Sequence, residues 1–79
     1  MQILRITMNN INEMVNYIEQ LPKLKINNNY VSKICINKHM DIELDKIYPI
    51  PKVKSSLSAE GILLIIDNNL KDYEIEIYF

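Results

Sequence analysis

Acidic and apolar side chains alternate in the segment Asp41-Ile42-Glu43-Leu44-Asp45. If this segment is a strand, alternate side chains share a face, and its three carboxylates line up about 6.5–7 Å apart. Such a row could bind a basic surface of a protein partner, and two of the carboxylates could also act as acid and base in catalysis. Glu74 and Glu76 repeat the spacing near the C-terminus. We therefore predict a partner-binding strip, with ordinary solvated alternation as the plainer alternative; its members are Asp41, Glu43, Asp45, Glu74 and Glu76.

Cys35 and His39 are the only cysteine and the only histidine, and a thiolate–imidazole pair is the chemistry that their spacing suggests. Cys35 falls in a predicted strand and His39 in the turn that follows it. No third residue is implied that would orient the imidazole. The plainer interpretation is a half-buried cysteine beside an exposed histidine.

The chain lacks the residue patterns that most cofactor and metal sites require. A single glycine leaves no glycine-rich phosphate loop or dinucleotide fingerprint. One cysteine cannot form an internal disulfide, and with one histidine it cannot complete a tetrahedral zinc site. We predict no cofactor, no metal and no enzymatic activity.

Length and charge limit the class of protein further. The chain has 79 residues, 48% of them apolar and 24% charged, which is typical of one small globular domain over residues 1–79. No apolar run approaches the ~18 residues that span a bilayer, and the N-terminus lacks the pattern of a signal peptide. We expect a cytoplasmic protein without membrane contact. The net charge of −1 does not favour nucleic acid as the main ligand.

Residues 1–36 predict a strand, a helix, a turn and a second strand. The first strand covers about residues 2–8. Asn10 and Glu13 form a capping box, and five apolar residues at helical spacing follow up to Pro22, which ends the helix. Asn27-Asn28-Asn29 predicts a tight turn before a strand at 30–36, because asparagine tolerates positive φ. The apolar stripe consists of Ile11, Met14, Val15, Ile18 and Leu21.

Residues 37–79 predict three more strands. A strand at 41–48 would form a hairpin with 30–36 through a three-residue loop at 37–39 or 38–40, which aligns the apolar residues of both strands. The apolar run Ile62–Ile66 predicts a strand inside the sheet, and the alternating residues 73–79 predict its hairpin partner with one wet face. A four-residue loop at 68–71, with Asn68 and Asn69 at the turn, would pair Leu64 with Ile75. The segment 49–60 is the one long connection, with a helical turn near Ser58–Glu60.

These elements predict an α+β fold of one helix packed on a mainly antiparallel five-stranded sheet, in two layers. One helix covers one face, so Leu63 and Ile65 on the other face need a separate lid. Val31, Cys35 and Ile47 are expected on that face too. The lid could be segment 49–60 through Ile50, Val53 and Leu57, a second copy of the chain, or a foreign partner.

The absent chemistry and the exposed strip favour a small non-enzymatic protein that inhibits or regulates a protein partner by occlusion. Phage anti-defence proteins and antitoxins share this profile of size and composition. Lys52 and Lys54 form a secondary contact in this hypothesis, and a homodimer through Leu63 and Ile65 is an open alternative. The runner-up is a nucleic-acid-associated domain whose dispersed lysines are Lys23, Lys25, Lys33, Lys52 and Lys54.

Overall fold

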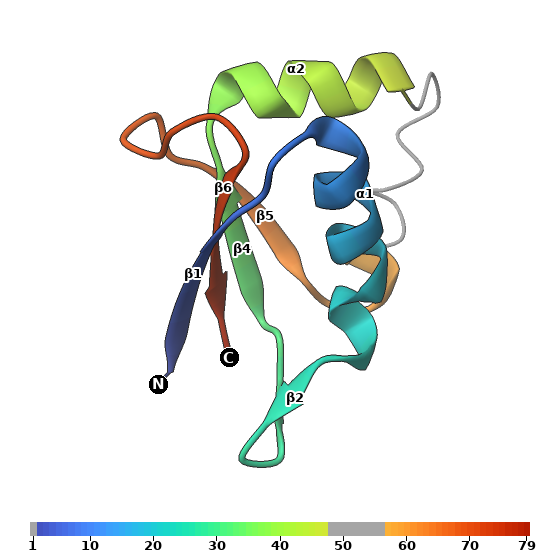
Figure 1. The fold of residues 1–79 in the computed structure, drawn as a ribbon. Coiled ribbons are helices and arrows are strands. Elements are labelled where there is room, and N and C mark those ends of the chain that lie inside the picture. Colours follow the sequence, from blue (N-terminus) through green and yellow to red (C-terminus); the bar gives the residue numbers. More distant parts are fainter. Residues whose placement is uncertain (1, 48–56) are drawn as a thin grey trace.

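The computed structural model describes residues 2–47 and 57–79 (Figure 1). Two helices of ten residues each and a mixed four-stranded sheet make up most of it. The elements in chain order are β1 (Ile3–Thr7), α1 (Ile11–Gln20), the 3₁₀ turn η1 (Leu21–Lys23), β2 (Lys25–Ile26), β3 (Asn29–Tyr30), β4 (Lys33–Ile36), α2 (Lys38–Ile47), β5 (Leu63–Ile66) and β6 (Glu74–Tyr78).

The predicted α+β class is confirmed, but the single antiparallel five-stranded sheet is not. The main sheet has the order β1-β6-β4-β5, and β2 and β3 form a separate two-stranded hairpin. β6 is antiparallel to both of its neighbours, whereas β4 and β5 are parallel. Both chain ends lie side by side in Figure 1, because the start of β1 pairs with the end of β6.

The helix cap and the asparagine turn predicted for the N-terminal half are both present. The Asn10 side chain accepts a hydrogen bond from the Glu13 backbone N–H (2.9 Å), so Asn10 is the predicted N-cap of α1. The Glu13 carboxylate reaches one residue further back than a capping box requires and accepts from the Asn9 N–H (3.0 Å). The turn between β2 and β3 has positive φ at Asn27 (50°) and Asn28 (66°), as the asparagine run predicts.

The strand predicted at 41–48 is wrong, because residues 41–47 belong to α2. Its N-cap is Asn37, whose side-chain oxygen accepts from the Met40 N–H (2.8 Å). Buried Met40 and Leu44 are spaced by four residues, which is the period of a helix. Asp41 lies in the first turn and Lys46 in the last, where each charge is favourable toward the helix dipole.

The predicted C-terminal hairpin is also wrong. β4 lies between β5 and β6, so Leu64 pairs with Ile34 and not with Ile75. Two parallel neighbours need a crossover of a dozen or more residues, and the segment that contains α2 supplies it between β4 and β5. The loop between β5 and β6 has its positive φ at Tyr73 (61°), whereas Asn68 and Asn69 do not take that conformation.

One core joins both helices to one face of the sheet. Its central side chains are almost fully buried, and they come from α1, η1, α2, β4, β6 and the turn before β5. At 25 cal/mol per Å², burial of each such side chain contributes roughly 1.5–3 kcal/mol. These residues are Met14, Ile18, Leu21, Ile34, Ile36, Met40, Leu57, Ile75 and Ile77.

Candidate functional site

The sheet has a face that no described helix covers, and we call it the open face. The strand register places on it the residues Ile3, Arg5, Thr7, Lys33, Cys35, Leu63, Ile65, Glu74, Glu76 and Tyr78. The predicted sharing of one face by Leu63, Ile65 and Cys35 is therefore correct. Val31 instead joins the core on the helix side, and Ile47 lies at the end of α2.

The middle of the open face is a cluster of charged and aromatic side chains that satisfy one another. The Glu76 carboxylate accepts one hydrogen bond from Arg5 Nη2 (2.6 Å) and another from the Tyr78 hydroxyl. Lys33 Nζ lies 4.1 Å from the centre of the Tyr78 ring. These neighbours leave Glu76 only 8% exposed although no described helix covers this face. The polar groups of this cluster therefore already have interaction partners within the chain.

The same contacts shift the pKa values of the Glu76 carboxyl and the Tyr78 hydroxyl. The hydrogen bond from Tyr78, followed by that from Arg5, lowers the pKa of Glu76. The bond to Glu76, together with burial, raises the pKa of the Tyr78 hydroxyl to about 12. Glu76 is therefore a fixed carboxylate at neutral pH, which makes it a poor proton donor.

The β5 side of the open face has no such cluster. Leu63 is 63% exposed and Ile65 41% exposed, and Ile66 on the helix side is 39% exposed. β5 is also an edge strand: it pairs with β4 only, and no described strand pairs with its outer edge. Of the residues offered for a lid, Leu57 is buried in the core, while Ile50 and Val53 lie outside the described residues.

The backbone of β5 presents hydrogen-bonding groups to this outer edge. The Leu63 N–H donates to Ser32 and the Asp67 N–H donates to Ile36, so odd-numbered residues face β4. In a parallel ladder the residues between them point the opposite way. Leu64 and Ile66 thus direct their N–H and C=O groups outward, along an edge with no charged side chain.

The predicted row of Asp41, Glu43 and Asp45 along a strand is not formed, because in α2 Glu43 lies on the side of the helix opposite to Asp41 and Asp45. Asp41 is buried and pairs with Lys38 Nζ (3.3 Å). Glu43 is half-buried and pairs with Lys46 (3.1 Å), whereas Asp45 is exposed. Lys52 and Lys54, the predicted secondary contact, lie outside the described residues.

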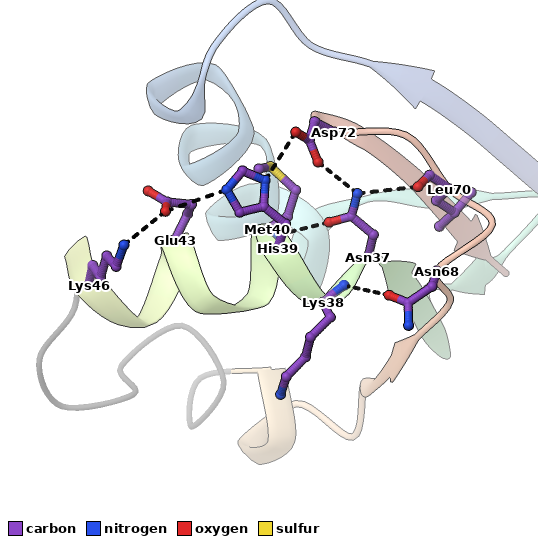
Figure 2. A network of polar contacts seen from close by, with 9 residues as sticks. All are labelled: Asn37, Lys38, His39, Met40, Glu43, Lys46, Asn68, Leu70 and Asp72. Atoms are coloured by element: carbon purple, nitrogen blue, oxygen red, sulfur yellow. Dashed lines mark hydrogen bonds and ion pairs between the residues drawn. The ribbon is translucent and has the colours of Figure 1, made fainter.

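The start of α2 holds a polar network that the sequence does not reveal (Figure 2). The Asn37 side-chain N–H₂ donates to Asp72 Oδ1 (2.8 Å) and to the Leu70 carbonyl (3.2 Å). His39 Nδ1 lies 3.0 Å from Asp72 Oδ2, and its other ring nitrogen lies 3.7 Å from Glu43. The bonds from Asn37 and then from His39 lower the pKa of Asp72. The network joins α2 to the loop between β5 and β6.

Cys35 and His39 do not form a thiolate–imidazole pair. The Cys35 side chain lies on the open face, while His39 contacts carboxylates at the start of α2. Burial of Cys35, with Glu76 nearby, raises the pKa of its thiol, which disfavours the nucleophilic thiolate. Cys35 is buried rather than half-buried, and His39 lies in a helix rather than in a turn.

The lysines of the nucleic-acid hypothesis belong to separate elements. Lys23 ends η1, Lys25 lies in β2 beside the Tyr30 ring, and Lys33 lies over Tyr78 on the open face. Nucleic-acid binding stays a prediction.

Comparison of the chain with protein-family models, with curated proteins and with solved structures finds no match. Within residues 2–47 and 57–79, no group of three histidine, cysteine or acidic side chains is placed to hold a metal ion. None of the described helices has the length and apolar composition needed to cross a membrane. The geometry of the sheet is therefore the basis for a functional hypothesis.

Proposed function

We propose that the protein is a small non-enzymatic binding module of the cytoplasm that inhibits or regulates a protein partner. It binds an extended segment of the partner as an additional strand on the outer edge of β5, and so occludes that segment. One observation carries the proposal: β5 is an uncharged edge strand whose outward amides pair with no described strand and whose residues Leu63, Ile65 and Ile66 are exposed.

Edge strands of this kind are ready to pair with another chain, and many proteins protect them with lysine, proline or a bulge. β5 contains no lysine or proline, and its pairing with β4 runs without a bulge. Strand addition supplies affinity through backbone hydrogen bonds and specificity through alternate side chains. Each bond contributes roughly 0.5–1.5 kcal/mol net, and full burial of Leu63 would add roughly 1.5–3 kcal/mol.

The surface differs from the acidic strip that the sequence suggests. Glu76 is already occupied by Arg5 and Tyr78, and Glu74 accepts a hydrogen bond from the Lys71 N–H (3.0 Å). Both carboxylates lie on β6, which β4 separates from the exposed apolar residues of β5. The partner's contact with β5 is therefore apolar and extended, in place of the basic surface expected from Asp41, Glu43 and Asp45.

The proposal is tested by selecting short random peptides, displayed on phage, against the immobilised protein. Binding of the selected peptides is measured by fluorescence anisotropy, and hydrogen exchange is followed at individual amides. Bound peptide should slow exchange at Leu64 and Ile66, whose amides face outward. The Ile66→Pro variant lacks one of these donors while the β4–β5 bonds remain, so it should bind about tenfold or more weakly.

A matched control exists at the other edge of the sheet. In β1 the residues that bond to β6 include Gln2 and Met8, so Thr7 has its N–H directed away from β6. Thr7→Pro should leave peptide binding unchanged. Failure to select any peptide, or binding that leaves Leu64 and Ile66 unprotected, would refute strand addition. A dimer in light scattering that Ile66→Pro abolishes would assign the edge to a second copy instead.

A further inference from the structure

A pocket of about 300 Å³ lies next to the start of β5. It is formed where η1, the end of the β2–β3 hairpin and the turn before β5 meet. Val31 and Ile62, both buried, belong to the core below it, whereas Tyr30 is 60% exposed. The lining residues are Pro22, Tyr30, Val31, Glu60 and Ile62.

The pocket combines an apolar lining with one negative charge. Among the described lining residues Glu60 is the only charged one, and its carboxylate has no hydrogen bond or ion pair with another described residue. The face of a tyrosine ring attracts cations, and Lys25 Nζ already lies 5.5 Å from the centre of the Tyr30 ring. Lys25 itself is not part of the lining.

We infer that this pocket binds the side chain of a lysine or arginine of the protein partner. These side chains have a long aliphatic stem that packs on apolar groups and a cationic end. The stem would lie on Pro22 and Ile62, with the charge between the Tyr30 ring and Glu60. The assignment to a partner residue rests on the proposed function, whereas the affinity of the pocket for a cation does not.

The position of the pocket also predicts where the basic residue stands in the partner. Directly opposite residues of paired strands have their side chains on the same side of the sheet. The Ile62 N–H already donates to the Leu57 carbonyl, so pairing with a partner would begin at Leu63. The partner residue next to the one opposite Leu63 then points to the helix side, toward the pocket. The residues opposite Leu63 and Ile65 point to the open face, where apolar side chains fit. The expected segment has a lysine or arginine at one end and apolar residues at the first and third positions from it.

Two small probes test the pocket by itself. Nα-acetyl-arginine methylamide and its uncharged norleucine analogue are titrated separately into ¹⁵N-labelled protein and followed by NMR. The arginine probe should shift the amides of Tyr30, Val31 and Ile62 in a saturable way, and the norleucine probe should bind more weakly. Equal binding of both probes, or no shift with the arginine probe, would overturn the inference.

Three variants locate the charge that the probe recognises. Glu60→Gln should weaken arginine binding by about threefold to fivefold, the size expected of an exposed ion pair. Lys25→Gln removes a competing cation from the ring and should strengthen binding by about twofold. Glu19→Gln, on exposed α1 surface outside the lining, should change nothing. An unchanged affinity in Glu60→Gln would refute the role of the carboxylate.

The selected peptides separate the two proposals. Peptides that protect Leu64 and Ile66 but contain no basic residue would refute the pocket assignment and leave strand addition standing. Arginine binding at the pocket without any peptide on β5 would refute the proposed function and leave a cation site. Enrichment of a terminal lysine or arginine that Glu60→Gln abolishes is the result expected if both are correct.

Discussion

β5 and β6 differ in composition and in position. A strand that is apolar on both faces usually lies inside a sheet, but here the apolar strand is at the edge and the alternating strand is inside. β6 alternates polar and apolar residues, yet it is paired on both sides, and Ile75 and Ile77 are 0% exposed. β5 is apolar at every position, yet it lies at the edge. A strand that is apolar on both faces needs cover on both faces, but the cover does not have to be the rest of the same chain. The surplus apolar surface of β5 is the basis of the proposed binding edge.

The largest expected difference between the strands is in stability. Ile77→Ala should lower the free energy of unfolding by about 2–5 kcal/mol, because it leaves a cavity in the core. Since a domain of this size nets only a few kcal/mol, Ile77→Val, with a loss of about 0.5–1.5 kcal/mol, serves as the milder variant. Leu63→Ala on β5 should change stability by less than about 0.5 kcal/mol. Urea denaturation measures all three, and a large loss in Leu63→Ala would mean that Leu63 is covered in solution.

An intermediate loss of stability is expected from substitutions where the loop between β5 and β6 contacts the start of α2. Asn37→Ala removes the N-cap of α2 and the bonds to Leu70 and Asp72, so it should cost about 1–3 kcal/mol. Asn68→Ala removes one exposed bond from the Lys38 N–H (3.0 Å) and should cost about 0.5–1 kcal/mol. Urea denaturation compares the two. Equal losses would contradict a special role of Asn37 in holding this loop.

Local patterns sufficed wherever the decisive contacts lie within a few residues. The Asn10 cap, the apolar stripe of α1, the Asn27-Asn28 turn and the alternation of β6 were all predicted correctly. α2 was missed because the alternation of Asp41 to Asp45 imitates a strand. Its cap is strengthened by contacts of Asn37 with Leu70 and Asp72, more than thirty residues away. No pattern in residues 37–47 could show those contacts.

The same limit applied to the candidate site. Leu63 and Ile65 were identified correctly as residues without cover from the predicted helix, but for the wrong sheet order. The insertion of β4 between β5 and β6 depends on pairing across most of the chain, which side-chain periodicity cannot specify. The pocket brings together Tyr30 and Glu60 from two distant segments. Neither residue belongs to a motif that would have indicated a site.

The smallest expected effect concerns Glu76 and its hydrogen-bond partners Arg5 and Tyr78. It tests whether these contacts hold the Glu76 carboxylate in solution. The pKa of Glu76 is lowered in the folded protein from its ordinary value of 4.5. A depressed pKa contributes stability above the unfolded value and loses it as the pH falls through the folded value. Glu76→Gln lacks this contribution, so its stability should fall less steeply than that of the wild type below pH 4.5. Asp72 contributes in both proteins and cancels in the comparison.

The same variant has a spectroscopic signature that a general loss of stability would not produce. Without the carboxylate, the pKa of the Tyr78 hydroxyl should return from about 12 toward 10, which the ultraviolet absorbance of tyrosinate reports. Leu63→Thr on β5 should leave both titrations unchanged, because Leu63 takes no part in the cluster. If Glu76→Gln left both profiles unaltered, Arg5 and Tyr78 would not hold Glu76 in solution. The β6 half of the open face would then be as available to a partner as β5, and the contrast between the two strands would no longer single out the edge.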